Sequence, residues 1–190
     1  MAASDLALVN AALAKLGASP IASLSGGDAV SSLCAALYAP VRDGLLSAYP
    51  WSFAVRQAAL TTPETVSPVA DYPYAFDVPD DHLRTLSVGA DGAGEGVSFR
   101  QIGGQIQTGL SSIILTYVAR VSETSFPPLF DLALIARLAA ELCVPITENA
   151  SRAEGLYRLC ELEFSRARSS DAQQDTPARI RRFSLIDVRG

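Results

Sequence analysis

The chain has 190 residues, of which 49% are hydrophobic and 18% are charged, and its formal net charge is −5. This composition supplies enough apolar side chains for a folded core and excludes an intrinsically disordered chain. The acidic balance argues against a freestanding nucleic-acid-binding domain, because such domains usually carry a clear basic excess. We expect one domain, or a compact domain with an insertion.

The three cysteines, Cys34, Cys143 and Cys160, are widely spaced and form no CxxC motif. This pattern predicts reduced, buried thiols rather than disulfides or metal ligands. We expect neither a metal ion nor another cofactor. The longest apolar stretch, residues 132–144, is too short to span a bilayer and carries two charges, so neither membrane insertion nor a signal peptide is expected.

The N-terminal part of the chain predicts two helices. Ser4 is expected to cap the first and Gly17 to end it, and Asp28 is expected to cap the second. Pro40 falls inside the second helical pattern, where it should kink or split the helix. The apolar residues at helical spacing are Leu6, Val9, Leu13 and Leu16 in the first helix, and Leu33, Leu37, Val41 and Leu45 in the second.

From Trp51 onward the apolar residues alternate with polar ones, which predicts strands. The pair Gly103-Gly104 predicts a two-residue hairpin turn. The glycine-rich stretch 89–96 joins two strands, so it is interpreted as a hairpin tip and not as a phosphate-binding loop. The region therefore predicts a small antiparallel sheet, with strands at residues 51–56, 74–78, 83–88, 97–102, 105–108 and 113–121.

Helical periodicity returns after the last predicted strand. Ser125 is expected to cap a third helix, which Pro145 should end. Thr147 or Ser151 is expected to start the fourth, because Ser151 and Glu154 have the spacing of a capping box. The apolar positions are Leu132, Ile135, Leu138 and Leu142 in the third helix, and Leu156, Leu159, Cys160 and Phe164 in the fourth.

These elements predict an α+β fold in three parts. A bundle of about four helices comprises residues 1–54 and 123–170. A small antiparallel β subdomain, residues 55–122, is inserted into it. An extended C-terminal arm, residues 171–190, completes the chain.

Residues 49–54 contain the only tryptophan and lie where the helical pattern changes to a strand pattern. We expect Tyr49, Trp51 and Phe53 to be buried at this subdomain junction, because large aromatic side chains bury much apolar area. Their role is interpreted as structural.

His82 is the only histidine, so any mechanism based on an imidazole must use it. It follows Asp80 and Asp81 in a stretch that predicts a solvent-exposed turn, and adjacent residues rarely converge on one metal ion. The turn is the favoured interpretation. A small cytosolic hydrolase that uses His82 with Asp80 or Asp81 as acid and base remains an alternative.

The C-terminal arm interleaves arginines with large apolar residues. One interpretation is a nucleic-acid-binding arm whose arginines contact phosphates. The favoured one is docking onto another protein subunit, for example by adding a strand, because the segment is too apolar for a freely solvated arm. The residues expected to dock are Arg179, Ile180, Arg181, Arg182, Phe183, Leu185, Ile186, Val188 and Arg189.

Several short stretches carry a family resemblance through their order and spacing. They are residues 9–17 followed by 20–21 and Leu24, residues 42–43 and 45–46, residues 49–54, and residues 74–76 leading to 78–81. With them the chain resembles, over nearly its whole length, the tail tubular protein A family of short-tailed bacteriophages, which are head-to-tail adaptors. It departs from the family pattern at Pro40 and in the glycine-rich stretch 89–96.

The resemblance implies a structural virion protein without enzymatic activity. Such an adaptor is expected to form a homo-oligomeric ring, dodecameric in form, between the phage portal protein and the tail nozzle. Double-stranded DNA would pass through its channel without sequence-specific binding. The expected location is the virion tail, and the host cytoplasm during assembly. The C-terminal arm would reach the portal or a neighbouring subunit.

Overall fold

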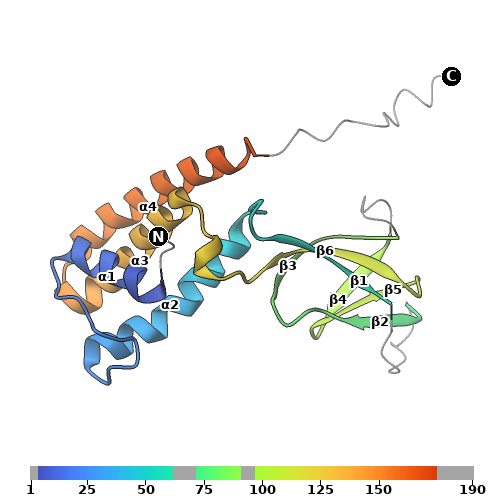
Figure 1. Cartoon of the computed structure of the whole chain (residues 1–190), viewed down its shortest axis with the longest axis horizontal. Helices are drawn as coiled ribbons and strands as arrows, with labels where there is room; N and C mark the ends of the chain where they lie inside the picture. Colours follow the sequence, from blue (N-terminus) through green and yellow to red (C-terminus); the bar gives the residue numbers. More distant parts are fainter. Residues whose placement is uncertain (1–3, 62–71, 91–96, 175–190) are drawn as a thin grey trace.

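The computed structural model describes residues 4–61, 72–90 and 97–174. Within these ranges, four α-helices and six strands form an α+β fold, which confirms the predicted fold class. The helices gather at one end of the long axis and the strands at the other (Figure 1). The predicted arm beyond Gln174 and most of the predicted hairpin tip at 89–96 lie outside the described residues.

Helix α1 (Asp5–Leu16) begins and ends as the sequence predicts. Ser4 Oγ accepts a hydrogen bond from the backbone N–H of Ala7 at 3.2 Å. Gly17 follows the helix with a φ of 73°, a left-handed conformation that costs glycine little because it has no Cβ. Both predicted boundaries are therefore confirmed.

Helix α2 (Ala29–Ala48) is continuous, so the predicted split at Pro40 is wrong. The side chain of Asp28 caps it, as predicted, by accepting a hydrogen bond from the backbone N–H of Ser31 at 2.9 Å. Pro40 is exposed. The carbonyl that loses its partner to a proline can therefore bind water, which lowers the cost of the interruption.

The buried side of α2 differs from the predicted one. Of the predicted stripe only Leu45 is buried, whereas Leu33, Leu37 and Val41 are partly exposed. The residues of α2 that enter the core are Ser31, Cys34, Tyr38, Leu45 and Leu46. The apolar pattern of α2 therefore includes side chains that the described residues cover only in part.

Helix α3 (Pro128–Thr147) has neither of its predicted ends. Ser125 lies in a short 3-10 helix, Glu123–Ser125, and α3 begins with Pro128, where a missing N–H costs nothing. Pro145 lies inside the last turns, and the helix ends at Glu148 with a φ of 52°. Leu132 of the predicted stripe is 43% exposed, because the buried face of α3 passes through Ala133 and Leu134 instead.

Helix α4 (Ala150–Asp171) is capped by Asn149, whose Oδ1 accepts a hydrogen bond from the backbone N–H of Arg152 at 2.9 Å. The predicted starts at Thr147 and Ser151 are wrong. Asparagine ranks with serine and aspartate as an N-cap residue, so local propensity did not separate the candidates.

The six strands form two three-stranded antiparallel sheets instead of one predicted sheet. Gly103 and Gly104, with φ of 59° and 81°, form the predicted hairpin turn. The first sheet has the order β1-β6-β3, from β1 (Val55–Leu60), β6 (Ile113–Ala119) and β3 (His82–Gly89). The second has the order β2-β5-β4, from β2 (Tyr74–Asp77), β5 (Gln105–Thr108) and β4 (Phe99–Ile102).

The chain enters and leaves the β subdomain through neighbouring strands. β1 and β6 are antiparallel partners, and Val55 pairs with Val118. Both links to the helical bundle therefore lie side by side (Figure 1). One apolar core cluster includes residues of both the helices and the sheets.

Cys34, Cys143 and Cys160 are buried free thiols, as predicted. In the described ranges no helix combines the length and the apolar character needed to cross a bilayer.

Candidate functional site

The subdomain junction is built on a tight turn at residues 51–54. The carbonyl of Trp51 accepts hydrogen bonds from the backbone N–H groups of Ala54 and Val55, both at 2.9 Å. The predicted strand start at Trp51 is therefore wrong, because this turn precedes β1. The turn directs the Trp51 ring back into the helical bundle, where it is 1% exposed.

Trp51 is the centre of an aromatic cluster that joins all parts of the junction. Its Nε1 donates a hydrogen bond to the carbonyl of Leu45 in α2 at 3.0 Å. The ring centroid lies 5.0 Å from that of Tyr49, 5.8 Å from Phe53, 5.1 Å from Phe130 in α3 and 5.5 Å from Phe164 in α4. We call these five rings the junction aromatic cluster. The tryptophan thus bonds to or contacts three helices.

A polar network connects α2 to the segment that returns from the β subdomain. We call Tyr38, Arg42, Asp43, Arg120 and Glu123 the Arg42 network. Glu123 accepts hydrogen bonds from the Tyr38 hydroxyl at 2.9 Å and from Arg42 Nη1 at 3.1 Å. Asp43 pairs with Arg42 Nε at 2.9 Å and with Arg120 Nη2 at 2.8 Å. The network therefore ties both subdomains together by charge-assisted hydrogen bonds.

Both carboxylates of the Arg42 network have lowered pKa values. Burial by itself raises the pKa of Glu123, but hydrogen bonds from its own backbone, Tyr38 and Arg42 outweigh burial. Burial also raises the pKa of Asp43, and the hydrogen bonds and charges of Arg120 and Arg42 again reverse the direction. Both groups are therefore ionised at neutral pH.

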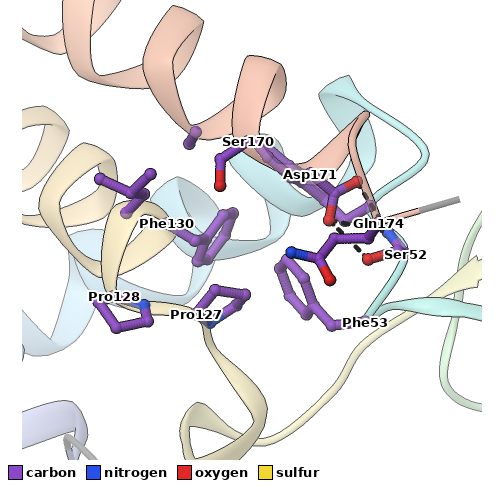
Figure 2. A pocket seen from close by; sticks show the side chains of 11 residues that line it. Ser52, Phe53, Pro127, Pro128, Phe130, Ser170, Asp171 and Gln174 are labelled. Carbon is purple, nitrogen blue, oxygen red and sulfur yellow. Dashed lines mark hydrogen bonds between the residues drawn. The ribbon is translucent and has the colours of Figure 1, made fainter.

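A cleft of about 420 Å³ opens beside the aromatic cluster, between the turn at 51–54, the start of α3 and the end of α4 (Figure 2). We call it the junction cleft. The Asp171 carboxylate accepts hydrogen bonds from the backbone N–H of Ser52 at 3.0 Å and from its hydroxyl at 2.7 Å. Asp171, at which the arm was predicted to begin, is therefore the last residue of α4 and is held on the junction turn.

The lining of the junction cleft suits binding of an apolar group rather than catalysis. Its polar side chains are Ser52, Ser170, Asp171 and Gln174, and the other lining residues are apolar. The carboxylate is already satisfied by Ser52, and the lining includes no imidazole, thiol or amine. The cleft can receive an apolar side chain, and the described chain ends at its rim with Gln174.

The sequence predicts a solvent-exposed turn at His82, and this prediction is wrong. His82 is the first residue of β3 and is partly buried. Its ring stacks on that of Tyr117, with the centroids 5.6 Å apart, and its Nε2 shares a hydrogen bond with Thr85 Oγ1 at 2.9 Å. Burial lowers the pKa of His82. The sheet contacts that bury the ring could not be read from the local sequence.

Asp81, next to His82, binds other partners. Asp81 accepts hydrogen bonds from Arg56 at 2.7 Å and from the Tyr117 hydroxyl at 2.9 Å. Neither Asp80 nor Asp81 hydrogen-bonds to the His82 ring in the described part of the chain. Nor do the residues with assigned positions contain a cluster of three histidine, cysteine or acidic side chains suited to a metal ion.

Of the three aromatic residues predicted to be buried, Trp51 is buried, whereas Tyr49 and Phe53 are partly exposed and contact its ring. Sequence reasoning missed the partners that fix them. Phe130, Phe164 and Asp171 are far away in the chain, and no local spacing connects them to the turn. The nine predicted docking residues from Arg179 to Arg189 lie outside the described residues.

No protein-family model matches this chain, and a search of curated proteins finds no match.

Proposed function

We propose that the chain is a structural virion protein, a head-to-tail adaptor. It forms a homo-oligomeric ring, dodecameric in form, that joins the phage portal protein to the tail nozzle and extends the DNA channel. The observation that carries this proposal is that the stretches of the family resemblance each make a defined contact in the fold.

The first of these stretches contains Asn10 and is followed by Ile21. The Asn10 side chain donates to the carbonyl of Ile21 at 3.0 Å and accepts from its backbone N–H at 2.9 Å. This paired hydrogen bond closes the connection after α1. An asparagine at this distance before the Pro20-Ile21 pair therefore has a physical reason.

Most of the remaining stretches meet at the subdomain junction, whereas residues 74–76 belong to β2 and pair with β5. Residues 42–43 belong to the Arg42 network, and the Leu45 carbonyl accepts the Trp51 hydrogen bond. The Asp81 carbonyl accepts a hydrogen bond from the backbone N–H of Arg120 at 2.6 Å. Stretches that are separate in the sequence thus stabilise one junction, which supports treating their order and spacing as a single pattern.

A junction of this kind suits a ring subunit. Closure of a ring requires the same angle between neighbours at every interface, because a small error per subunit accumulates around the circle. The two adjacent links and the Arg42 network restrain the angle between bundle and β subdomain, and the aromatic cluster fixes the turn from which β1 starts. The net charge of −5 is also compatible with a channel in which DNA slides without sticking.

The test is co-expression of the full-length chain with its cognate portal protein, followed by electron microscopy of the purified particles. We expect a ring of added density beneath the portal. A chain that lacks residues 179–190 should remain folded and fail to attach. A full-length chain that stays monomeric and ignores the portal at high concentration would refute the adaptor function.

A further inference from the structure

Helix α2 carries an apolar stripe that the described chain leaves partly uncovered. Pro40, Gly44 and Ala48 are exposed, and Leu37 and Val41 are partly exposed. Their spacing of three and four residues places them on one side of the helix. Leu37 and Val41 belong to the stripe whose burial the sequence predicts, and the described residues cover both only in part.

The stripe forms one wall of a groove of about 480 Å³. Cys160, Glu161 and Phe164 of α4 form the opposite wall, and Arg137 and Glu141 of α3 form the floor. We call it the α2–α4 groove. It is separate from the junction cleft, since the two share no lining residue.

The groove extends toward the end of the bundle that is remote from the strands. Val144 follows Arg137 and Glu141 at helical spacing on α3 and is 47% exposed. Tyr157 precedes Glu161 by one turn on α4, and the Arg137 guanidinium lies 5.2 Å from the centroid of its ring. The apolar surface is therefore longer than a single side-chain pocket.

The groove also has an excess of negative charge. Arg137 and Glu141 neutralise each other in an ion pair of 2.7 Å. Glu161 is exposed and makes no ion pair with any residue of the described part. A suitable occupant is consequently apolar along its length and carries positive charge.

We propose that the α2–α4 groove receives the C-terminal arm of a second copy of this chain. The arm combines five large apolar residues with four arginines and one aspartate between residues 179 and 190. Its apolar side chains cover the α2 stripe, and an arginine pairs with Glu161. The proposal rests on the proposed function, because it supplies the contact between neighbouring subunits of the ring.

The length of chain beyond the described part allows this exchange. Sixteen residues, 175–190, follow Gln174. At about 3.3 Å per residue they reach roughly 50 Å when extended, which exceeds the width of a small domain. Each subunit would place its arm in the groove of one neighbour and receive the arm of the other neighbour in its own groove. This is a head-to-tail contact, and contacts of that kind generate rings.

The experiment mixes two full-length variants with complementary defects. Gly44→Arg fills the groove and adds positive charge there, while its arm is intact. An added Cβ at Gly44 meets no heavy atom within 4 Å, so the helix accepts a side chain at this position, and thermal unfolding tests whether the whole arginine is accommodated. The second variant, Phe183→Asp with Ile186→Asp, has a damaged arm and an intact groove. Gly44→Ala is the matched control, since it leaves the groove open.

Sedimentation velocity then measures assembly. We expect the wild type and Gly44→Ala to form oligomers and each defective variant alone to remain monomeric. The mixture of the two should form a one-to-one dimer and nothing larger, because one intact arm meets one intact groove. Unchanged thermal unfolding of Gly44→Arg shows that the subunit is folded.

Three results would overturn the proposal. The first is a wild type that stays monomeric with its groove filled by its own arm. The second is a mixture that remains monomeric. The third is normal assembly of Gly44→Arg alone. Portal binding is measured separately. A portal-bound ring formed by Gly44→Arg would refute the groove proposal and leave the adaptor function intact. A one-to-one dimer in the mixture, together with a wild type that does not bind the portal, would support the groove proposal and refute the adaptor function.

Discussion

The side chains on the two sides of α2 differ in how completely the described residues bury them. On the core side, Cys34, Tyr38 and Leu46 are buried, and Arg42 is held by Asp43 and Glu123. On the groove side, Leu37 and Val41 are only partly covered and Gly44 is exposed. The core side of α2 therefore fixes the subunit's fold, and the groove side is the surface that we propose contacts a partner.

The largest expected effect on the core side follows from Trp51→Ala. The substitution removes a fully buried ring and its hydrogen bond to Leu45, so it should lower the free energy of unfolding by about 3–5 kcal/mol. Urea denaturation of the purified chain measures the change. Normal stability and normal assembly of this variant would show that the aromatic cluster is not the centre of the junction.

Loss of the Arg42 network should have the next largest effect. Glu123→Ala leaves Tyr38 and Arg42 without their acceptor and should cost about 1–3 kcal/mol at pH 7. Glu161→Ala is the matched control on the groove side, and a surface change of this kind should alter stability by less than about 0.5 kcal/mol. Equal losses in the two variants, measured by urea denaturation, would show that the Arg42 network contributes no more to stability than the lining of the groove.

The network also predicts a direction of pH dependence. The folded-state pKa values of Asp43 and Glu123 lie below their ordinary values. Their contribution to stability is therefore complete above the unfolded-state pKa, about 4, and is lost as the pH falls through the folded-state values. Wild type should destabilise more steeply than Glu123→Ala in this acidic range.

Asp131 in α3 should change the stability with pH in the opposite direction. Its Oδ1 is buried without a hydrogen-bond partner, and burial raises the pKa of Asp131 to about 6. The folded state holds this proton more tightly, so stability should fall as the pH rises from about 4 to about 6. Asp131→Asn should remove this dependence and stabilise the chain at pH 7 by about 1–2 kcal/mol, a value reduced for the group's partial exposure. Thermal unfolding of both chains at pH 4 and pH 7 checks this, and a less stable Asp131→Asn chain at pH 7 would contradict it.

The smallest expected change in stability comes from a substitution on the groove side of α2. Gly44→Ala should raise the free energy of unfolding by about 0.5–1 kcal/mol, because alanine favours the helix and the added methyl group meets open space. A gain in urea stability without loss of assembly is the expected result. Destabilisation would indicate that α2 is covered at this point within the subunit.

Much of the fold was predictable because its signals are local. Ser4, Gly17 and Asp28 act as caps through neighbouring backbone groups, and Gly103-Gly104 suits only a tight turn. The errors arose where distant contacts decide. Pro40 and Pro145 lie at exposed positions inside helices, where water can replace the hydrogen bond that each proline removes. The single predicted sheet became two because pairing partners are not encoded in alternation alone.

The candidate site was predictable only in part. Three neighbouring aromatic residues at a change of periodicity indicated a junction. The carboxylate of Asp171 in α4 was not associated with Ser52, because 119 positions separate them and neither belongs to a recognisable motif. The stripe Leu33, Leu37, Val41 and Leu45 was identified, but periodicity measures apolar character and does not say which molecule covers it.

Native mass spectrometry of the purified complex between the full-length chain and its cognate portal tests the central claim most directly. The account predicts a portal assembly whose added mass corresponds to a closed ring of this chain, with the dodecamer as the expected number of copies. A portal assembly that retains its own mass in the presence of saturating chain would contradict the account.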